Sequence, residues 1–385
     1  MFKKFIPYMP YIMIIFLNIV LFVVLSITAY MHLFQDEFIL YYPHEPDGVI
    51  AGDEPDEIFE EPYEDYEEID EGPFFYCALT ALRVPTKEQA MRRPAAIMLD
   101  NRNRALPHLG ISRAGVIYEF LVEDGITRLM MLTTDYEDAP IFGPIRSARI
   151  YYIPIALQHD AVYIHAGGDE MAYTELRRSR INNINEIQMR AGVRSSELFF
   201  RDAERRRNGF PFEHTLMMAG SNLRGVIERY NYRVSHEEGF EPPYIFGPTV
   251  LDGESAVFMR LYYSRRYAVE FTYDPDTGHY FRSQYGEPHI DGTNGAELSF
   301  MNVVVLYARY TPTGHANGYL RCDLERGGDG KYLTGGRYIN ITWRFDPARG
   351  RIVMLDANGD ELILNPGRTF FCIPPFLSNH PTVIY

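Results

Sequence analysis

The pattern of hydrophobic and polar residues divides the chain into four segments of different character. Residues 11–30 are almost continuously apolar, and residues 43–72 are rich in aspartate, glutamate and proline. From about residue 75, short apolar runs end at charged residues or glycines, which is typical of buried strands followed by loops or helices. Beyond residue 250, turn residues separate runs of alternating apolar and polar residues, so that part is predicted to be β-rich.

The apolar segment 11–30 predicts a transmembrane helix, because about 20 apolar residues suffice to cross a bilayer. Lys3 and Lys4 precede it and acidic residues follow it, so residues 1–10 are expected to be cytoplasmic and the body extracytoplasmic. The protein would then be a signal-anchored, single-pass protein of the cell membrane. The alternative is a cleaved signal peptide, whose apolar core would normally be shorter.

Residues 31–74 are predicted to form an acidic, disordered stalk. Their acidic and proline-rich composition buries too little apolar surface to offset the entropy lost on ordering. Calcium capture is the alternative, but the tract lacks the patterned loop of an EF-hand. A solvated spacer between the membrane and the folded body is therefore the preferred interpretation.

Residues 75–232 are predicted to form a mixed α/β domain. Asp169 is an expected helix N-cap, and Asp124-Gly125 between two β-rich runs predicts a two-residue hairpin turn. Pro154 confines the regular part of one helix to either side of it. Strands are expected at 95–99, 116–123, 126–134 and 160–165, and helices at 147–158, 169–178 and 221–230.

A linker at 233–249, broken by Pro-Pro and Gly-Pro pairs, is predicted to precede a β-rich domain at 250–385. The glycine-rich stretch 326–330 is interpreted as a flexible turn. Trp343 is expected in the core because it alternates with apolar neighbours along its strand. Strands are expected at 256–263, 267–273, 280–285, 300–307, 318–324, 338–345, 351–355, 361–364 and 369–373.

The composition narrows the functional classes. The 385 residues are 46% hydrophobic and 14% aromatic, which is ample for packed cores and excludes a largely disordered protein. The net charge of −15 argues against nucleic-acid binding, although much of that charge lies in the stalk. Cys77, Cys322 and Cys372 lie far apart and form neither a disulfide framework nor metal-ligand spacing. Neither a metal nor a cofactor is predicted.

The predicted hairpin carries the first group of candidate site residues. A two-residue turn at 124–125 would pair Leu121 with Arg128, so Glu119 and Glu123 would share a sheet face with Arg128. The functional interpretation is a preorganised carboxylate–guanidinium group that holds a cation, a substrate amine or a catalytic acid. The alternative is a structural ladder of salt bridges.

Arg146 and Arg149 form the second group, in the sequence Gly-Pro-Ile-Arg-Ser-Ala-Arg at 143–149. Being three residues apart, they would lie on one side of the start of the helix predicted at 147–158. Free backbone N–H groups at a helix start attract anions, whereas the macrodipole disfavours cations there. The two arginines are thus expected to hold a negative group, either an external phosphate or carboxylate or an internal glutamate.

His165, Gly167 and Gly168 form the third group, in the order strand, glycine turn and helix. The glycines permit close backbone approach, but no Gly-Lys-Ser/Thr follows as in a P-loop. His165 is a candidate acid, base or ligand, or else a satisfied structural residue. His214 is its candidate partner, and a metal site made by both histidines and a carboxylate is a minor alternative.

Taken together and in order, these residues resemble the YerB-like family of bacterial putative lipoproteins, a two-part domain of unknown function. The resemblance implies a surface-tethered protein with an N-terminal and a C-terminal family domain. It supplies no established activity and no catalytic residue. It rests on the stretches 93–101, 114–128, 143–149 and 161–168, and on 280–282, 302–305, 342–343 and 365–367.

The chain departs from the lipoprotein pattern in two places. No cysteine closely follows the apolar segment, since Cys77 lies beyond the stalk, so a membrane helix is expected to replace the lipid anchor. Where the family usually has Gly-Gly before Ile-Thr-Arg, this chain has Asp124-Gly125, which keeps the turn.

The leading hypothesis is a membrane-anchored, extracytoplasmic protein that binds an anionic cell-envelope component or scaffolds envelope machinery. A peptidoglycan stem peptide or an anionic wall polymer would bind Arg146, Arg149, His165 and the glycine turn, with the hairpin charges fixing the pocket. The alternative is a cell-wall hydrolase or transferase in which Glu119 or Glu123 works with His165 or His214. At roughly 13 Å along one strand, the two glutamates exceed the usual carboxylate separations of glycosidases. A purely structural partner of another membrane protein would show no concave pocket.

Overall fold

The computed structural model describes residues 74–377 and 379–385. The predicted cytoplasmic segment, membrane helix and stalk lie outside the described residues and stay sequence predictions. Among the helices that are described, none is long and apolar enough to cross a membrane. The described residues all belong to one compact unit.

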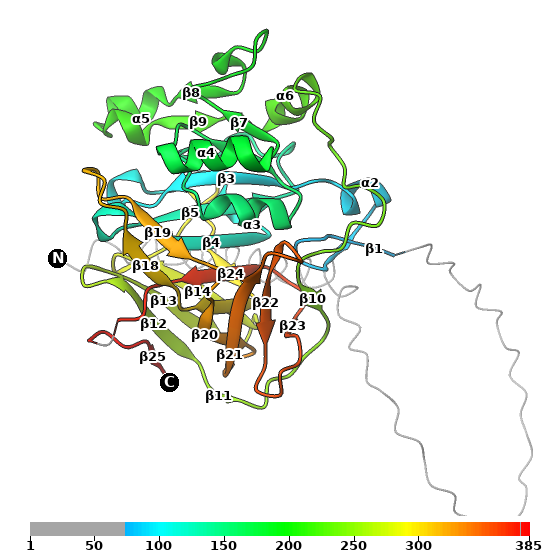
Figure 1. Cartoon of the computed structure of the whole chain (residues 1–385), viewed down its shortest axis with the longest axis vertical. Helices are drawn as coiled ribbons and strands as arrows, with labels where there is room; N and C mark the ends of the chain where they lie inside the picture. Colours follow the sequence, from blue (N-terminus) through cyan, green and yellow to red (C-terminus); the bar gives the residue numbers. More distant parts are fainter. Residues whose placement is uncertain (1–73, 378) are drawn as a thin grey trace, which may run out of the picture. The chain divides into compact units, whose positions relative to one another are not determined.

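An eleven-stranded sheet runs through both halves of the described chain (Figure 1). In spatial order its strands are β11 (Glu254–Ser255), β21 (Arg337–Asp346), β20 (Gly328–Thr334), β17 (Asn302–Leu306), β24 (Thr369–Ile373), β4 (Val116–Leu121), β5 (Thr127–Thr133), β3 (Ala95–Asp100), β6 (Val162–His165) and β7 (Asn183–Asn185), with β22 (Arg351–Leu355) beside β21.

Strand β24, which lies near the C-terminus, joins the two halves of this sheet. It pairs in parallel with β4 of the N-terminal half and with β17 of the C-terminal half. The architecture is therefore a mixed α/β N-terminal part whose sheet continues into a strand-rich C-terminal part. Within the predicted linker at 233–249, the described structure has one short strand, β10 (Ile245–Phe246).

A second sheet, of six strands, packs against the C-terminal half of the first. The rings of Phe271 and Phe300 lie 5.3 and 5.1 Å from that of Phe370 on β24, so the two sheets share an aromatic core. Its strands are β15 (Glu287–Pro288), β14 (His279–Gln284), β13 (Tyr267–Asp274), β12 (Phe258–Ser264) and β25 (Val383–Ile384), with β16 (Ser299–Phe300) beside β14. Smaller pairs are β1 (Phe75–Tyr76) with β2 (Arg83–Val84), β8 (Phe199–Arg201) with β9 (Leu216–Met218), β18 (Arg309–Pro312) with β19 (Leu320–Asp323), and β10 with β23 (Ile363–Leu364).

The helices of the described chain are short and confined to the N-terminal part (Figure 1). The predicted N-cap is confirmed, because Asp169 Oδ1 accepts a hydrogen bond of 2.8 Å from the backbone N–H of Ala172. The described α-helices are α2 (Lys87–Ala90), α3 (Tyr152–Gln158), α4 (Glu170–Ser179), α5 (Ala203–Arg207) and α6 (Leu223–Arg229).

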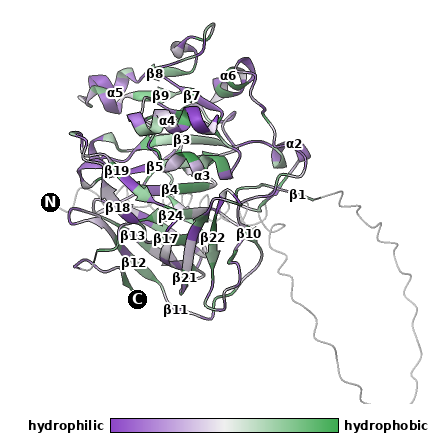
Figure 2. Cartoon of the chain, in the orientation of Figure 1, coloured by the Kyte–Doolittle hydropathy of each residue, from purple (hydrophilic) through white to green (hydrophobic). Residues whose placement is uncertain are grey.

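Every residue of β3, β4 and β5 is buried. Hydrophobic residues dominate α3 and β4 in the middle of the molecule, whereas α5 at the periphery is largely hydrophilic (Figure 2). The charged side chains of these central strands therefore require partners inside the protein. They are the residues around which the candidate site is built.

The helix predicted at 147–158 is wrong in its first turn. Helix α3 begins at Tyr152, so Arg146 and Arg149 both precede it and do not share a helical face. The backbone of residues 146–148 instead bonds to its neighbours: Arg146 N–H donates to Met98 O, and Ala148 N–H donates to Gly167 O. Pro154 falls in the first turn of α3, where its missing N–H costs nothing.

The flexible turn predicted at 326–330 is also wrong in part, because β20 begins at Gly328 and pairs with both β17 and β21. A Cβ at Gly330 would lie 2.5 Å from Val305 O, so the neighbouring strand leaves room only for glycine there. A glycine that signals a turn in the sequence is thus required by close strand packing. Trp343 is 3% exposed, and its predicted place in the core is confirmed.

The predicted hairpin exists, but its register differs by one residue. Leu121 pairs with Thr127 and Phe120 pairs with Arg128, because five residues rather than two connect the strands. Directly opposed residues share a face, so Arg128 lies on the opposite face from Glu119. The prediction that both glutamates share one face with Arg128 is therefore wrong.

Candidate functional site

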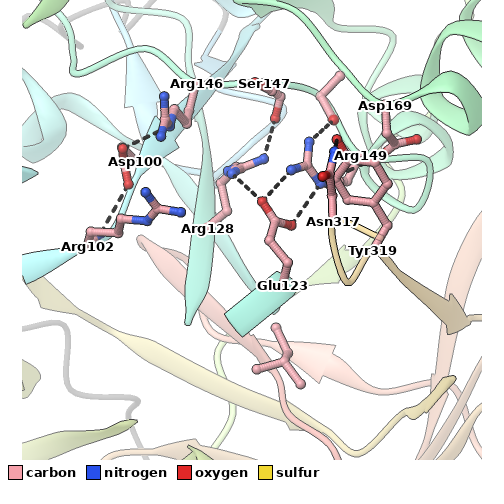
Figure 3. Close-up of polar contacts among 12 residues, drawn as sticks. Asp100, Arg102, Glu123, Arg128, Arg146, Ser147, Arg149, Asp169, Asn317 and Tyr319 are labelled. Carbon is pink, nitrogen blue, oxygen red and sulfur yellow. Dashed lines mark hydrogen bonds and ion pairs between the residues drawn. The ribbon is translucent and has the colours of Figure 1, made fainter. Parts of the chain in front are cut away.

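The register places two charged clusters on opposite faces of the β4–β5 pair. The closed cluster consists of Glu119, Arg282 and the three other residues that bond to Glu119, namely Asn101, Thr127 and Tyr267. The open cluster consists of Asp100, Arg102, Glu123, Arg128, Arg146, Arg149 and Asp169 (Figure 3). All seven residues of the open cluster lie in the N-terminal part. Arg128 lies on β5, and the other six come from connections or from the end of a strand.

Glu123 is the acidic centre of one side of the open cluster. Its Oε2 accepts from Arg149 Nε at 3.1 Å and its Oε1 from Arg149 Nη2 at 2.5 Å, while Arg128 Nη2 lies 3.4 Å from Oε1. Asp169 Oδ2 lies 3.5 Å from the same Arg149 Nε. Burial alone would raise the pKa of Glu123, but the charges of Arg128 and Arg149 hold it below its usual value.

Asp100 is the acidic centre of the other side. Its Oδ2 lies 2.9 Å from Arg146 Nε and 2.8 Å from His214 Nδ1, and its Oδ1 accepts from the Arg102 backbone N–H. Burial would raise the pKa of Asp100, but the hydrogen bond from His214 and the charge of Arg146 hold it well below its usual value. The carboxylate is therefore ionised at any physiological pH.

Three further guanidinium groups lie around these two carboxylates. In Figure 3 the Arg146 guanidinium is directed to Asp100 and that of Arg128 to Ser147 and Glu123, while that of Arg102 has no dashed contact. Arg128 is 3% exposed and donates to Ser147 O at 2.8 Å, whereas the Arg146 side chain is 21% exposed. Burial lowers the pKa of Arg128, and the charge of Arg149 adds to this effect.

The open cluster has more positive than negative groups. Four arginines face three carboxylates, Asp100, Glu123 and Asp169. Within the described residues, the Arg102 guanidinium has no hydrogen bond or ion pair, and Arg146 makes only its Nε contact with Asp100. The terminal nitrogens of both arginines are thus free to donate to an anion.

The closed cluster differs because both oxygens of its carboxylate are paired inside the protein, although Arg282 Nε and Asn101 Oδ1 have no hydrogen-bond partner among the described residues. Glu119 Oε2 lies 2.8 Å from Arg282 Nη2, and both side chains are fully buried. The other oxygen, Oε1, accepts hydrogen bonds from Asn101, Thr127 and Tyr267. Burial opposes the charge of Arg282, but Glu119 raises its pKa above the usual value. This ion pair fastens β14 of the C-terminal part to β4.

A chain of histidines leads from the closed cluster to Asp100. Arg282 Nη1 donates to His289 Nδ1 at 2.6 Å, so His289 Nε2 must donate to His108 Nδ1 at 2.8 Å. His108 Nε2 then donates to the Asp100 backbone oxygen at 2.7 Å. Because every ring nitrogen has a fixed role, both histidines are neutral. Burial lowers the pKa of His108 to about 4, consistent with this assignment.

His165 is fully buried, and both of its ring nitrogens face neighbouring protein groups. Burial lowers its pKa to about 4, so the ring is neutral and donates from one nitrogen only: Nδ1–H donates to Gly167 O at 2.8 Å, while Nε2 lies 3.4 Å from Asn183 Oδ1. The N–H of Gly167 donates to Asn185. The geometry matches the alternative in which His165 is a satisfied structural residue.

The structure thus brings together Glu123, Arg128, Arg146 and Arg149 of the predicted site, and His214 through Asp100. It places Glu119 in the closed cluster. His165, Gly167 and Gly168 belong to the segment that packs against residues 146–148, beside the arginines. His165 and His214 share no partner among the described residues, so the minor alternative of a joint metal site gains no support.

Sequence reasoning missed Asp100, Arg102 and Arg282. The first two stand in Asp-Asn-Arg directly after a buried strand, where polar residues commonly mark binding sites. They directly follow the strand predicted at 95–99, so a local signal for them exists. Arg282 gave no such signal, because its partner Glu119 lies 163 residues away in the chain.

Comparisons with known proteins agree with this two-part organisation. Residues 79–233 match the model of the N-terminal domain of a protein of unknown function, DUF3048, and residues 259–371 match the C-terminal domain of the same family. Putative lipoprotein YerB of Bacillus subtilis (strain 168) is 26% identical over 303 residues, covering 78% of this chain and 86% of the relative.

The fold is also similar to a solved structure. A crystal structure of YerB from Bacillus subtilis superposes with a TM-score of 0.69 at 25% identity, covering 80% of this chain and 99% of that one. The resemblance inferred from the sequence motifs is confirmed. The chain belongs to the two-domain DUF3048 family, as a homologue of the putative lipoprotein YerB.

Proposed function

We propose that the protein is an extracytoplasmic binding protein, anchored by the segment 11–30, which holds an anionic group of an envelope component at the open cluster. The observation that carries this proposal is the surplus of guanidinium donors. Arg102 and Arg146 present terminal nitrogens without a partner in the described structure, beside the carboxylates of Asp100 and Glu123, whose oxygens already have partners. An oxyanion would satisfy these donors and balance the charge.

The ligand class follows from the shape of the donors. A planar guanidinium fork matches carboxylate or phosphate oxygens in a bidentate way, and the unpartnered terminal nitrogens of Arg102 and Arg146 offer such forks to an oxyanion. The carboxylate of a peptidoglycan stem peptide and the phosphate of an anionic wall polymer both satisfy this chemistry. The sequence of residues 11–30 and the lipoprotein name of the Bacillus relative both support an envelope location.

The alternative of a wall hydrolase or transferase gains no support from the geometry. Glu119 is fully buried and all its acceptor sites are engaged by Arg282 and neutral donors. The lowered pKa of Glu123 is the wrong direction for a general acid, which needs a raised pKa. His165 is fully buried, so a substrate does not reach its ring nitrogens.

The test uses the full chain in detergent with two soluble probes, a muropeptide and poly(glycerol phosphate). Arg146→Ala is expected to weaken binding by about 10- to 100-fold, because a hydrogen bond to a charged group contributes about 1.5–3 kcal/mol. Arg178→Ala is the matched control, because this side chain is 76% exposed on α4. Unchanged affinity in a folded Arg146→Ala variant would reject the proposal, whichever probe binds.

A further inference from the structure

The C-terminal part contains an open groove of about 1000 Å³, away from the open cluster. This volume lies at the upper end of the range for small-molecule sites, about 300–1,000 Å³. Nothing in the proposed anion site uses it. Three kinds of side chain line it: aromatic rings, uncharged polar groups and charges of both signs, chiefly Tyr307, Phe376, Asn340, Thr342, Lys331 and Asp329.

The floor of the groove is a flat polar strip on the large sheet. Asp329 pairs with Thr342 and Lys331 pairs with Asn340 across β20 and β21, so these four side chains share one face. Lys331 Nζ donates to Asn340 Oδ1 at 2.7 Å, which fixes two of them in place. One pair further along the same face, Leu333 is fully buried. The six-stranded sheet therefore covers this face only in part, and the groove opens where the cover ends.

The wall of the groove is aromatic. The Phe376 residue is 76% exposed, so its ring is accessible to a ligand in the groove. Its ring meets that of Tyr307 edge-on at 6.1 Å, and Tyr307 is held by a hydrogen bond of 2.5 Å to Thr382. Rigid rings thus stand beside the polar strip.

The charges of the groove nearly cancel. Arg309, Arg326 and Lys331 oppose Asp329 and Asp356, in contrast to the arginine surplus of the open cluster. A polyanion would gain little from such a lining. A sugar ring fits it better, because its C–H face packs on an aromatic ring while its hydroxyl groups bond to amide, hydroxyl and carboxylate side chains at the edge.

We propose that this groove binds an uncharged glycan chain, with sugar rings against Phe376 and Tyr307 and hydroxyl groups on the strip formed by Asp329, Lys331, Asn340 and Thr342. The site is independent of the anion site, since the two share no residue. Together the two sites would let one molecule hold a glycan and an anionic group. Either site can be disproved without disproving the other.

The test titrates the full chain in detergent with a soluble hexamer of β-1,4-linked N-acetylglucosamine. Trp343 is the only tryptophan, and although it lies on the other face of β21 its indole N–H donates to Tyr307 O at 3.2 Å, so its fluorescence reports on the groove indirectly, through Tyr307. We expect saturable quenching or a spectral shift, and calorimetry should give the same affinity. Phe376→Ala and Asn340→Ala should each weaken binding by about tenfold.

Phe74→Ala is the matched control, because Phe74 is 45% exposed in the N-terminal part. Arg146→Ala should also leave hexamer binding unchanged, which separates this site from the anion site. Absence of hexamer binding would overturn the proposal, as would equal binding by the Phe376→Ala variant. Saturable binding of a stem peptide at the groove in place of the hexamer would overturn it too.

Discussion

The open and closed clusters lie on opposite faces of the same two strands, yet they end in different states. In the closed cluster, one glutamate and one arginine meet in full burial and each remaining oxygen has a neutral donor. In the open cluster, four arginines share three carboxylates and two side chains reach toward solvent. Charge that is completely paired serves the fold, whereas charge left in surplus at an accessible edge is available to a ligand.

Removing Arg282 is expected to have the largest effect on this comparison. Arg282→Met would leave the buried Glu119 carboxylate without its counter-charge, which costs about 3–5 kcal/mol of unfolding free energy. Urea denaturation followed by Trp343 fluorescence measures the loss. The double variant Glu119→Gln/Arg282→Met should recover much of it, because no buried charge then remains. A single variant as stable as the wild type would show that the closed cluster is not structural.

Low pH should destabilise the folded protein through His108 and His289, the two histidines that adjoin the closed cluster. His108 has its pKa lowered to about 4 by burial, and burial with the Arg282 charge lowers the pKa of His289 well below its usual value. The unfolded chain binds protons near pH 6.5, so stability is complete above that pH and falls toward pH 4, by roughly 2 kcal/mol per histidine at pH 4.5.

Melting temperatures measured between pH 7 and 4.5 test this pH dependence. His108→Gln should flatten the profile while lowering its upper end, whereas the exposed His315→Asn should leave the profile unchanged. An identical slope in wild type and His108→Gln would show that the histidine chain does not control acid lability.

Glu123→Gln should have a smaller effect than Arg282→Met, about 1–3 kcal/mol. In this variant Arg149 still lies 3.5 Å from Asp169, and Arg128 still donates to the Ser147 oxygen, so each guanidinium retains a partner. The added positive surplus should also tighten binding of the phosphate probe. Denaturation and titration of one preparation give both values, with Glu175→Gln on α4 as the control. Weaker phosphate binding would mean that Glu123, rather than the arginine surplus, shapes the site.

The smallest expected effect concerns the ring over Arg149. The guanidinium carbon lies 5.0 Å from the Tyr319 ring centroid, and a cation–π contact at a partly exposed position contributes about 0.5–1 kcal/mol. Tyr319→Leu should lower the unfolding free energy by that amount and leave anion affinity within about twofold. A larger loss of affinity would place the β18–β19 connection in the binding site itself.

Several parts of this organisation were readable from sequence because they depend on local chemistry. The strand at β3, the helix capped by Asp169 and the turn-rich β pattern of the C-terminal half all follow from periodicity and capping. Of the two arginines in the motif at 143–149, Arg149 meets Glu123, one of the partners that the sequence left open, whereas Arg146 meets Asp100, and no helix presents either of them.

The errors have two physical causes: a local connection longer than the turn pattern suggests, and a neighbour distant in sequence that overrides a local preference. The five-residue connection after β4 shifted the register by one residue, and this single step moved Glu119 to the other face. Gly330 reads locally as a turn, but the approach of Val305 makes it part of a strand.

The sequence by itself determined the family and the mixed α/β and β-rich halves. Only the tertiary structure decided which carboxylate each arginine meets. Burial makes an unpaired charge costly, so partners are chosen by the packing of whole sheets, and Arg282 reaches Glu119 across 163 residues for that reason. The accessible surplus that remains around Arg102 and Arg146 is the outcome of this pairing, and no local pattern encodes it.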